Sequence, residues 1–328
     1  MADLAPLRSG GRGQRAQLLG EPWGDTSRVR RPYAKDPSVI AFDGRYLLYF
    51  SLPPAEPAGT GAGGWGIGIA ESSDLFSWRT IAALPRSGDY DARGRAAPGA
   101  VVLHGRVHLF FQTYGNGAGD AICHASSEDG LRFTPAPDNP VFAPRGDWTC
   151  GRAIDADVVP FQDRLLLGYA TRDPDFRVQS VGFAAAPLDS DFGRDSWRQL
   201  STDGPALFPQ LPWEWDCIEA PALCVRDGHL VAFYAGGYNN EPQQIGVATS
   251  SDGVGWTKLS EDPWLTNGRP GEWNSSESGH PGLLLSPDGA SHLFLQGNDD
   301  GGQTWRIAGL SLEWDGMRPR VGQPVAPG

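Results

Sequence analysis

One unit of about 60 residues recurs five times along this chain of 328 residues. Each copy begins with an apolar run, passes a turn that contains glycine, and enters a second run rich in aromatic residues. The copies start near residues 37, 98, 157, 221 and 281. Such a regular period constrains the fold more than any other feature of the sequence, because every copy has to adopt the same small structure.

The second half of each unit repeats as well. A Ser/Asp-rich phrase followed by Trp or Phe closes three of the copies, at residues 69–78, 124–133 and 247–256, and a looser version lies at 183–197. Four short strands ending in a tight turn are typical of a propeller blade, and radial repetition protects strand edges. The sequence therefore predicts an all-β fold: a five-bladed β-propeller with four-stranded antiparallel blades over residues 33–328, preceded by a short N-terminal extension, residues 1–32.

Composition agrees with this fold and narrows the partners. The chain has 44 Gly and 28 Pro, which suits many turns and argues against long helices. A net charge of −12 speaks against nucleic acid or an anionic membrane surface as a partner, since both require a basic patch. No run approaches the ~18 apolar residues that a membrane span needs. Residues 1–17 lack the apolar region of a signal peptide, so the expected location is the cytoplasm.

The four cysteines show no C-x-x-C spacing. Neither a zinc site nor a disulfide framework is indicated, and buried free thiols are expected.

Three carboxylates stand at the start of apolar runs in units one, three and four: Asp36, Asp155 and Glu219. The first strand of a propeller blade runs along the central axis, so three acids in register there should converge. A single Asp before a strand usually caps a turn. Several carboxylates packed together raise at least one pKa, and a protonated acid beside an ionised base is what glycoside cleavage needs.

Further polar residues are candidates for the same funnel. Asp157 follows Asp155 by two residues, so it shares a face if the segment is extended and competes for the same role. Arg172 opens an Arg-Asp-Pro sequence that we interpret as a rim loop in contact with substrate. The fifth unit places Glu277 and His280 at the funnel, where His280 either lines the site or is structural.

Tryptophans precede several of these acids, and sugar rings stack on such side chains. The candidates are Trp148, Trp215 and Trp273, with blade-to-blade packing as the alternative for each. A Pro- and Gly-rich insertion, residues 52–64, is expected to wall off one end of the funnel. A pocket in place of a groove favours exo-action on a terminal sugar.

These motifs together resemble those of the five-bladed propeller glycoside hydrolases of families 43, 62, 32, 68 and 117, most closely families 43 and 117, over roughly residues 33–315. The sequence Lys35-Asp36-Pro37-Ser38 resembles the first-blade motif that carries the general base. Ala153-Ile154-Asp155 resembles the third-blade motif whose Asp tunes the pKa of the acid. Ile218-Glu219-Ala220-Pro221 resembles the fourth-blade motif whose Glu is the general acid.

This resemblance implies an inverting, exo-acting glycosidase that removes an arabinofuranoside, xyloside or anhydro-galactoside from short oligosaccharides. Asp36 activates a water, Glu219 protonates the departing oxygen, and Asp155 keeps Glu219 protonated and binds a sugar hydroxyl. The base and acid carboxyls then stand roughly 6.5–9.5 Å apart.

Two other functions remain open. A glycoside phosphorylase or transglycosidase uses the same scaffold, but phosphate calls for clustered cations, and only Arg152 and Arg172 are near. A non-catalytic sugar-binding propeller is the third interpretation.

The resemblance requires no cofactor, and it leaves room for a structural calcium ion, held through water, on the axis near His280. Family 117 proteins have an N-terminal segment that reaches a partner subunit. Residues 1–32 therefore suggest a homodimer, with a frayed terminus as the alternative.

Overall fold

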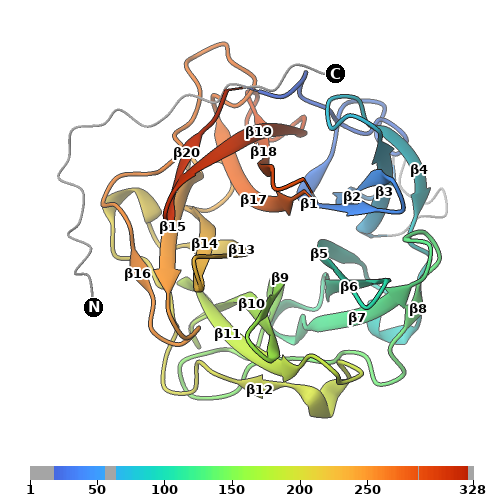
Figure 1. Ribbon diagram of the computed structural model, residues 1–328, viewed down its shortest axis with the longest axis vertical. Helices are drawn as coiled ribbons and strands as arrows, with labels where there is room; N and C mark the ends of the chain where they lie inside the picture. Colours follow the sequence, from blue (N-terminus) through green and yellow to red (C-terminus); the bar gives the residue numbers. More distant parts are fainter. Residues whose placement is uncertain (1–17, 56–63, 287, 324–328) are drawn as a thin grey trace.

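Five sheets of four strands surround a central axis in the computed structural model (Figure 1), which describes residues 18–55, 64–286 and 288–323. Every sheet is antiparallel and consists of four strands that are consecutive in the chain. The predicted five-bladed propeller with four-stranded blades is therefore confirmed. None of the described residues forms a helix long and apolar enough to cross a membrane.

The strands follow the repeat closely. Blade 1 consists of β1 (Lys35–Phe42), β2 (Arg45–Leu52), β3 (Gly66–Ser72) and β4 (Arg79–Ala83). Blade 2 consists of β5 (Arg95–Leu103), β6 (Arg106–Thr113), β7 (Ile122–Ser127) and β8 (Thr134–Pro135). Blade 3 consists of β9 (Ile154–Phe161), β10 (Arg164–Arg172), β11 (Gln179–Pro187) and β12 (Arg198–Gln199).

The last two blades have the same plan. Blade 4 consists of β13 (Ile218–Arg226), β14 (His229–Gly236), β15 (Gln244–Ser250) and β16 (Thr257–Lys258). Blade 5 consists of β17 (Glu277–Leu285), β18 (Ser291–Asn298), β19 (Arg306–Asp315) and β20 (Arg318–Val321). Single turns of 3-10 helix lie in the connections: η1 (Asp89–Asp91), η2 (Gly117–Gly119), η3 (Arg194–Ser196) and η4 (Pro212–Glu214).

The repeated Ser/Asp-rich phrase is the turn between the third and fourth strands. In blade 1 the side chain of Asp74 accepts hydrogen bonds from the backbone N–H groups of Phe76 and Ser77, at 2.8 and 2.9 Å, while Ser72 Oγ donates to Asp74 at 2.9 Å. Asp129 and Asp252 make the same contacts in blades 2 and 4. Short polar side chains that bond to their own backbone stabilise such turns, which explains why this phrase recurs.

Each blade packs a large aromatic ring of its second strand over the facing residue of its third strand. Phe50 lies opposite Gly68, and Tyr234 lies opposite Gly246. A Cβ atom at either glycine would meet the ring at 2.4 Å, so only glycine leaves room for it. The repeating aromatic of the second run is thus the buried centre of each blade, and all these rings are at most 1% exposed.

No blade combines strands from the two ends of the chain, because each sheet consists of four consecutive strands. The innermost strands β1 and β17 contact each other directly. In addition, the segment 18–34 lies along β19: Leu19 N donates to Gly309 O at 2.7 Å, and Trp23 exchanges backbone hydrogen bonds of 2.8 and 2.7 Å with Ile307. The described part of the predicted N-terminal extension therefore packs on its own propeller. Residues 1–17 lie outside the described residues.

Candidate active site

A β-bulge near the start of each innermost strand aims side chains at the axis. The register of all five strands shifts there, and one residue in each has a positive φ. These residues are Asp36 (54°), Ala97 (46°), Asp155 (52°), Ala220 (49°) and His280 (42°). A non-glycine residue in this conformation is strained by about 1–2 kcal/mol, and such bulges often re-aim a side chain beside a functional site.

The bulges correct one expectation from the sequence. Asp36, Asp155 and Glu219 are not all in register, because Glu219 precedes the bulge residue Ala220 by one position. The residue in register with Asp36 and Asp155 is His280. Glu219 nevertheless lines the cavity. The pairing of β13 with β14 shifts between Glu219 and Ala222, directly after Glu219.

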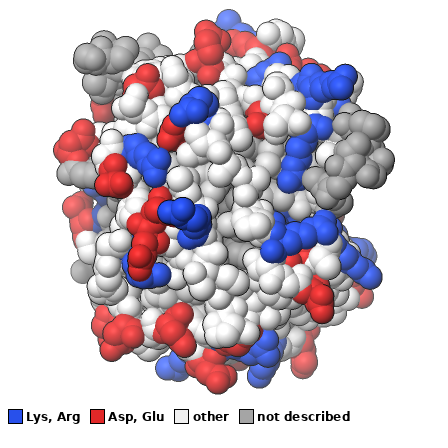
Figure 2. Space-filling model, turned by 90° about the vertical axis from the view of Figure 1, so that its right-hand side faces the viewer, with Lys and Arg blue, Asp and Glu red and all other residues white. Residues whose placement is uncertain are grey.

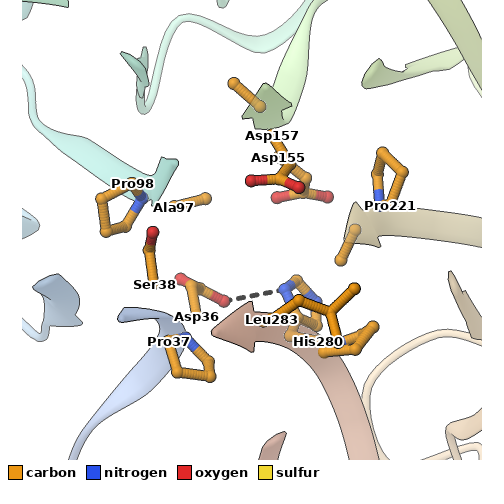
Figure 3. Close-up of a pocket in the computed structure, with 14 residues that line it drawn as sticks. Asp36, Pro37, Ser38, Ala97, Pro98, Asp155, Asp157, Pro221, His280 and Leu283 are labelled. Carbon is orange, nitrogen blue, oxygen red and sulfur yellow. Dashed lines mark ion pairs between the residues drawn. The ribbon is translucent and has the colours of Figure 1, made fainter. Parts of the chain in front are cut away.

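His280 bridges two of the three acids. Its Nδ1 lies 2.8 Å from Asp36 Oδ1, and its Nε2 lies 3.0 Å from Glu219 Oε1. The dashed line in Figure 3 marks the ion pair with Asp36. Burial disfavours the charged ring, but the two carboxylates outweigh burial, and the pKa of His280 lies well above its ordinary value. A charged imidazolium therefore donates a hydrogen bond to each acid.

Glu219 is held by amide donors as well as by the imidazolium. Gln243 Nε2 donates to Oε1 at 2.7 Å, and Gln179 Nε2 donates to Oε2. The orientation of the Gln179 amide is fixed chemically, because its oxygen accepts from Arg172 Nε at 2.9 Å and an arginine can only donate. Burial raises the pKa of Glu219, but the imidazolium, the Gln243 hydrogen bond and the charge of Lys35 together outweigh burial and lower the pKa overall.

Burial and the charge of His280 also have opposite effects on the pKa values of Asp36 and Asp155. The net result is a lowered pKa for Asp36 and a raised pKa for Asp155. Burial raises the pKa of Asp36, but the charge and hydrogen bond of His280, together with Lys35 and Ser51, outweigh burial and bring the pKa to about 2. Burial raises the pKa of Asp155 to about 7, and repulsion from Glu219 and Asp36 reinforces that shift against the opposing effect of His280. We expected Asp155 to keep Glu219 protonated. In the ligand-free site the pKa of Asp155 is the one that is raised, because His280 is bonded to Glu219 and not to Asp155.

A cavity of about 160 Å³ opens above these groups. Blades 1 and 2 supply an aromatic wall, Trp65 and Tyr114, whose ring centroids are 5.6 Å apart. Blades 3 and 4 supply Arg152, Arg172 and Tyr238. The cavity therefore combines a surface on which a sugar ring can stack with guanidinium groups that can donate hydrogen bonds.

Asp157 lies in a different place from Asp155. It lines a narrow channel farther along the axis, where it stands next to Asp155 and across from Ser38 and Leu283 (Figure 3), and it does not line the cavity. Its Oδ2 accepts a hydrogen bond from Leu223 N at 2.6 Å. Burial raises the pKa of Asp157 to about 7. Of the two competing acids, the structure brings Asp155 to the cavity.

The predicted aromatic and fifth-blade contacts fall mostly outside the cavity. Trp148 and Trp273 pack against the apolar cores of the blades, and Trp215 is 61% exposed away from the cavity lining. Glu277 is fully buried, with Oε1 accepting from Gln296 at 2.8 Å. These four residues are not brought to the lining. Of the insertion at 52–64, residues 56–63 lie outside the described residues.

The first part of the sequence, residues 30–152, matches the family model of the glycosyl hydrolases family 32 N-terminal domain. No curated protein matches the chain by sequence. A crystal structure of a thermostable family-43 glycoside hydrolase superposes with a TM-score of 0.71 at 20% identity, covering 89% of this chain and 93% of that chain. The chain has the fold of the five-bladed propeller glycoside hydrolases of families 32 and 43.

Two further structures extend this likeness over most of the propeller. A GH32 β-fructofuranosidase from Bombyx mori superposes with a TM-score of 0.67 at 16% identity, covering 95% of this chain and 66% of that chain. An α-L-arabinofuranosidase from Lactobacillus brevis gives a TM-score of 0.63 at 20% identity, covering 90% of this chain and 95% of that chain. The family-32 match includes Asp36 but ends before Asp155 and Glu219, so the geometry carries the argument for those two acids.

Among the described residues, one buried group has donor atoms close enough to hold a metal ion. Asp155, Glu219 and His280 each offer one ligand atom within 4.8 Å of the others. The Oδ2 atom of Asp155 is buried and has no hydrogen-bond partner among the described residues. Both His280 nitrogens already contact carboxylates, so a cation would be held by the two acids together with a deprotonated ring.

Several residues of the site carried no signal in the sequence. Gln112 Oε1 accepts from Asp155 N at 2.7 Å, and Gln296 Oε1 accepts from Asp36 N at 3.0 Å. Each glutamine belongs to the second strand of the preceding blade and fixes the strained bulge of the next one. A glutamine at the end of an apolar run has no distinctive pattern, although the shared place of Gln112 and Gln296 in the unit is visible once the blades are aligned.

Proposed function

We propose that this protein is an inverting glycoside hydrolase in which Asp36 is the general base and Glu219 is the general acid. The observation that carries the proposal is the bridge through His280. Two carboxylates bonded to opposite nitrogens of one imidazole stand about 7–8 Å apart, which suits the roughly 6.5–9.5 Å of an inverting pair and exceeds the roughly 5 Å of a retaining pair.

The reaction follows from this charge arrangement. A water placed by Asp36 attacks the anomeric carbon, its proton goes to Asp36, and the bond to the leaving oxygen breaks as that oxygen takes a proton from Glu219. Glu219 is ionised in the ligand-free site, so its proton comes from His280 Nε2, 3.0 Å away. After the reaction Asp36 releases the proton to water, and His280 Nε2 takes one from water, so the imidazolium is restored and the cycle consumes no net proton.

Asp155 has the role of a substrate contact in this mechanism. Its Oδ2 has no protein partner among the described residues, and its pKa of about 7 lets the carboxyl donate to or accept from a sugar hydroxyl near neutral pH. The small cavity favours exo-action on one terminal sugar. Arabinofuranosides and xylosides are our first candidates, with anhydro-galactosides next, and the likeness to a β-fructofuranosidase adds fructosides to the set to be tested.

The test is hydrolysis of aryl and oligosaccharide glycosides of these sugars, with the product anomer followed by NMR. Glu219→Gln should lose about 10²–10⁴-fold in rate on substrates with a poor leaving group, and far less on dinitrophenyl glycosides, which need no acid. Asp36→Asn should lose activity on both. Glu128→Gln serves as the matched control, because Glu128 is 80% exposed at the outer part of blade 2.

Three results would overturn the proposal in whole or in part. A retained anomeric configuration would exclude inversion. Equal binding of sugars by wild type and Glu219→Gln, with no turnover by either, would assign the propeller to sugar binding without catalysis. If Asp155→Asn, and not Glu219→Gln, shows the dependence on the leaving group, the proton donor is Asp155.

A further inference from the structure

Two guanidinium groups line the cavity and have no part in the mechanism above. Arg152 lies just before β9, and Arg172 ends β10. Both converge on one acceptor, since Arg172 Nε lies 2.9 Å and Arg152 Nη1 lies 3.4 Å from Gln179 Oε1. Two like charges directed at one neutral amide oxygen are not an arrangement that stabilises the fold by itself.

Arg172 is held firmly in place. Its guanidinium carbon lies 4.5 Å from the centroid of Phe176 and 5.1 Å from that of Tyr238. Tyr238 is fixed in turn by donating its hydroxyl to Arg177 O at 2.6 Å. Arginine stacks on aromatic faces while its edge N–H groups remain able to bond. The side chain is therefore pre-organised before any ligand arrives.

The positive charge of this pair is poorly neutralised. Among the described residues, no carboxylate lies within ion-pair distance of Arg172. Arg152 has Asp120 Oδ2 at 3.8 Å, which is a long contact, and its side chain is only 12% exposed. Keeping charge in a largely buried wall without a close partner is costly, and an anionic ligand would offset that cost.

The position of Arg152 and Arg172 relative to the acid indicates which part of the substrate they contact. Gln179, which accepts from both arginines, donates to Glu219 through its other end. The guanidinium groups therefore flank the acid, while Asp36 lies across the imidazole ring. Since the acid protonates the leaving oxygen, the sugar beside Arg172 is the leaving sugar.

We propose that the leaving sugar of the substrate has an acidic substituent, a carboxylate or a phosphate, bound by Arg172 and Arg152. Arginine forks match both oxyanions with paired hydrogen bonds. The assignment to the leaving side rests on the proposed function. The anion site itself rests only on the two arginines.

Binding of monosaccharides tests the site without any turnover. Dissociation constants would be measured by NMR at low salt for galacturonate, glucuronate and glucose 6-phosphate, against galactose, glucose and inorganic phosphate. Wild type should prefer at least one acidic sugar to its neutral counterpart by about 10-fold or more, as expected for charge-assisted hydrogen bonds. Arg172→Gln should remove this preference, and Arg172→Lys should retain part of it.

Arg177→Gln is the matched control, because Arg177 is 74% exposed on the same loop and its side chain pairs with Asp175. It should bind as wild type does. The better of uronate and sugar phosphate identifies the substituent. Equal binding of acidic and neutral sugars, a preference that persists in Arg172→Gln, or inorganic phosphate binding as tightly as the sugar phosphate would each overturn the proposal.

The hydrolysis assay separates the two proposals. If an acidic sugar is preferred through Arg172 but no glycoside is cleaved, the anion site stands and the hydrolase proposal fails. If neutral glycosides are cleaved and no acidic sugar is preferred, the hydrolase proposal stands and the anion site fails.

Discussion

A single imidazole sets the charges of the candidate site at the scale of residues. His280 is 6% exposed and touches Asp36 through one nitrogen and Glu219 through the other. Its charge and hydrogen bonds, with smaller contributions from Lys35 and other neighbours, outweigh the effect of burial on both carboxylates. The same ring therefore fixes the distance between the two acids, favours the ionised form of both, and can give its Nε2 proton to Glu219.

Replacing His280 with Asn removes the charge and keeps a polar side chain. The pKa of Asp36 should then rise from about 2 toward its ordinary value. Because the base must be ionised to act, the acid limb of the pH profile of kcat/KM should move to higher pH by about one unit or more. His229→Asn, outside the cavity, is the control. If kcat/KM falls by the same factor at every pH and the acid limb of its pH profile does not shift, His280 has only a structural role.

The aromatic wall gives a second prediction. If a sugar ring stacks on Trp65, then Trp65→Ala should raise KM by about 5- to 10-fold with a smaller change in kcat, because the contact is present before and during the reaction. Trp215→Ala should leave KM unchanged, since Trp215 is 61% exposed and outside the cavity lining. A larger effect at Trp215 than at Trp65 would restore the interpretation drawn from the sequence.

The sequence predicted the acids of the site better than its walls. Asp36, Asp155, Glu219, Arg172 and His280 all reach the cavity, as their motifs suggested. Their catalytic and binding roles stay predictions. The predicted tryptophans lie outside the cavity lining, since a Trp suits both blade packing and sugar stacking, and order along the chain does not say which side of a strand it faces.

At the scale of elements, the bulge in each innermost strand decides what faces the axis. The period of the repeat was visible because every blade needs the same apolar runs and the same turn. The bulge was not visible, because its positive φ occurs at Asp36, Ala97, Asp155, Ala220 and His280, which share no composition. A shift of one residue changes which side chain points inward, and Glu219 was therefore placed in the wrong register.

The segment 18–34 is the element that joins the first blade to the last. Trp23 packs edge-on against Phe50 of β2, with centroids 5.1 Å apart, and is bonded to Ile307 of β19. Trp23→Ala should lower the free energy of unfolding by about 2–3 kcal/mol, less than for a fully buried Trp because this one is partly exposed. Urea unfolding gives the value.

The control for this prediction is Trp215→Ala, an exposed substitution of the same kind, for which the change should stay within about 0.5 kcal/mol. Equal effects at the two positions would show that the segment contributes nothing to closing the ring.

At the scale of the whole molecule, acidity is spread over the surface and concentrated near the axis. Figure 2 shows one face on which Lys and Arg alternate with Asp and Glu in spite of the net charge of −12. Around the axis, by contrast, burial raises the pKa values of Asp155, Asp157 and Glu277 to about 7 each. The folded protein thus holds protons that the unfolded chain releases near pH 4.

These three carboxyls contribute stability that falls with rising pH, whereas carboxyls with a lowered pKa, such as Asp36, contribute with the opposite sign. A carboxyl whose pKa is raised on folding binds more protons in the folded state between about pH 4 and 7, so the free energy of unfolding decreases across that window. Asp157→Asn removes one such group and keeps an oxygen that accepts from Leu223 N. The variant should match wild type near pH 4 and exceed it by about 1–2 kcal/mol at pH 8, a value reduced because Asp157 is partly exposed to the channel.

Urea unfolding at pH 4.5, 6 and 8 measures this effect, with Asp175→Asn, 74% exposed, as the control that should show no such trend. If the stability advantage of Asp157→Asn over wild type grows with pH, the ionised form of Asp157 destabilises the folded protein. A variant that is less stable than wild type at pH 8, or a difference that ignores pH, would mean that Asp157 is ionised in the folded protein and that its bond to β13 outweighs burial. The ring would then tolerate a charge on its axis without a cation beside it.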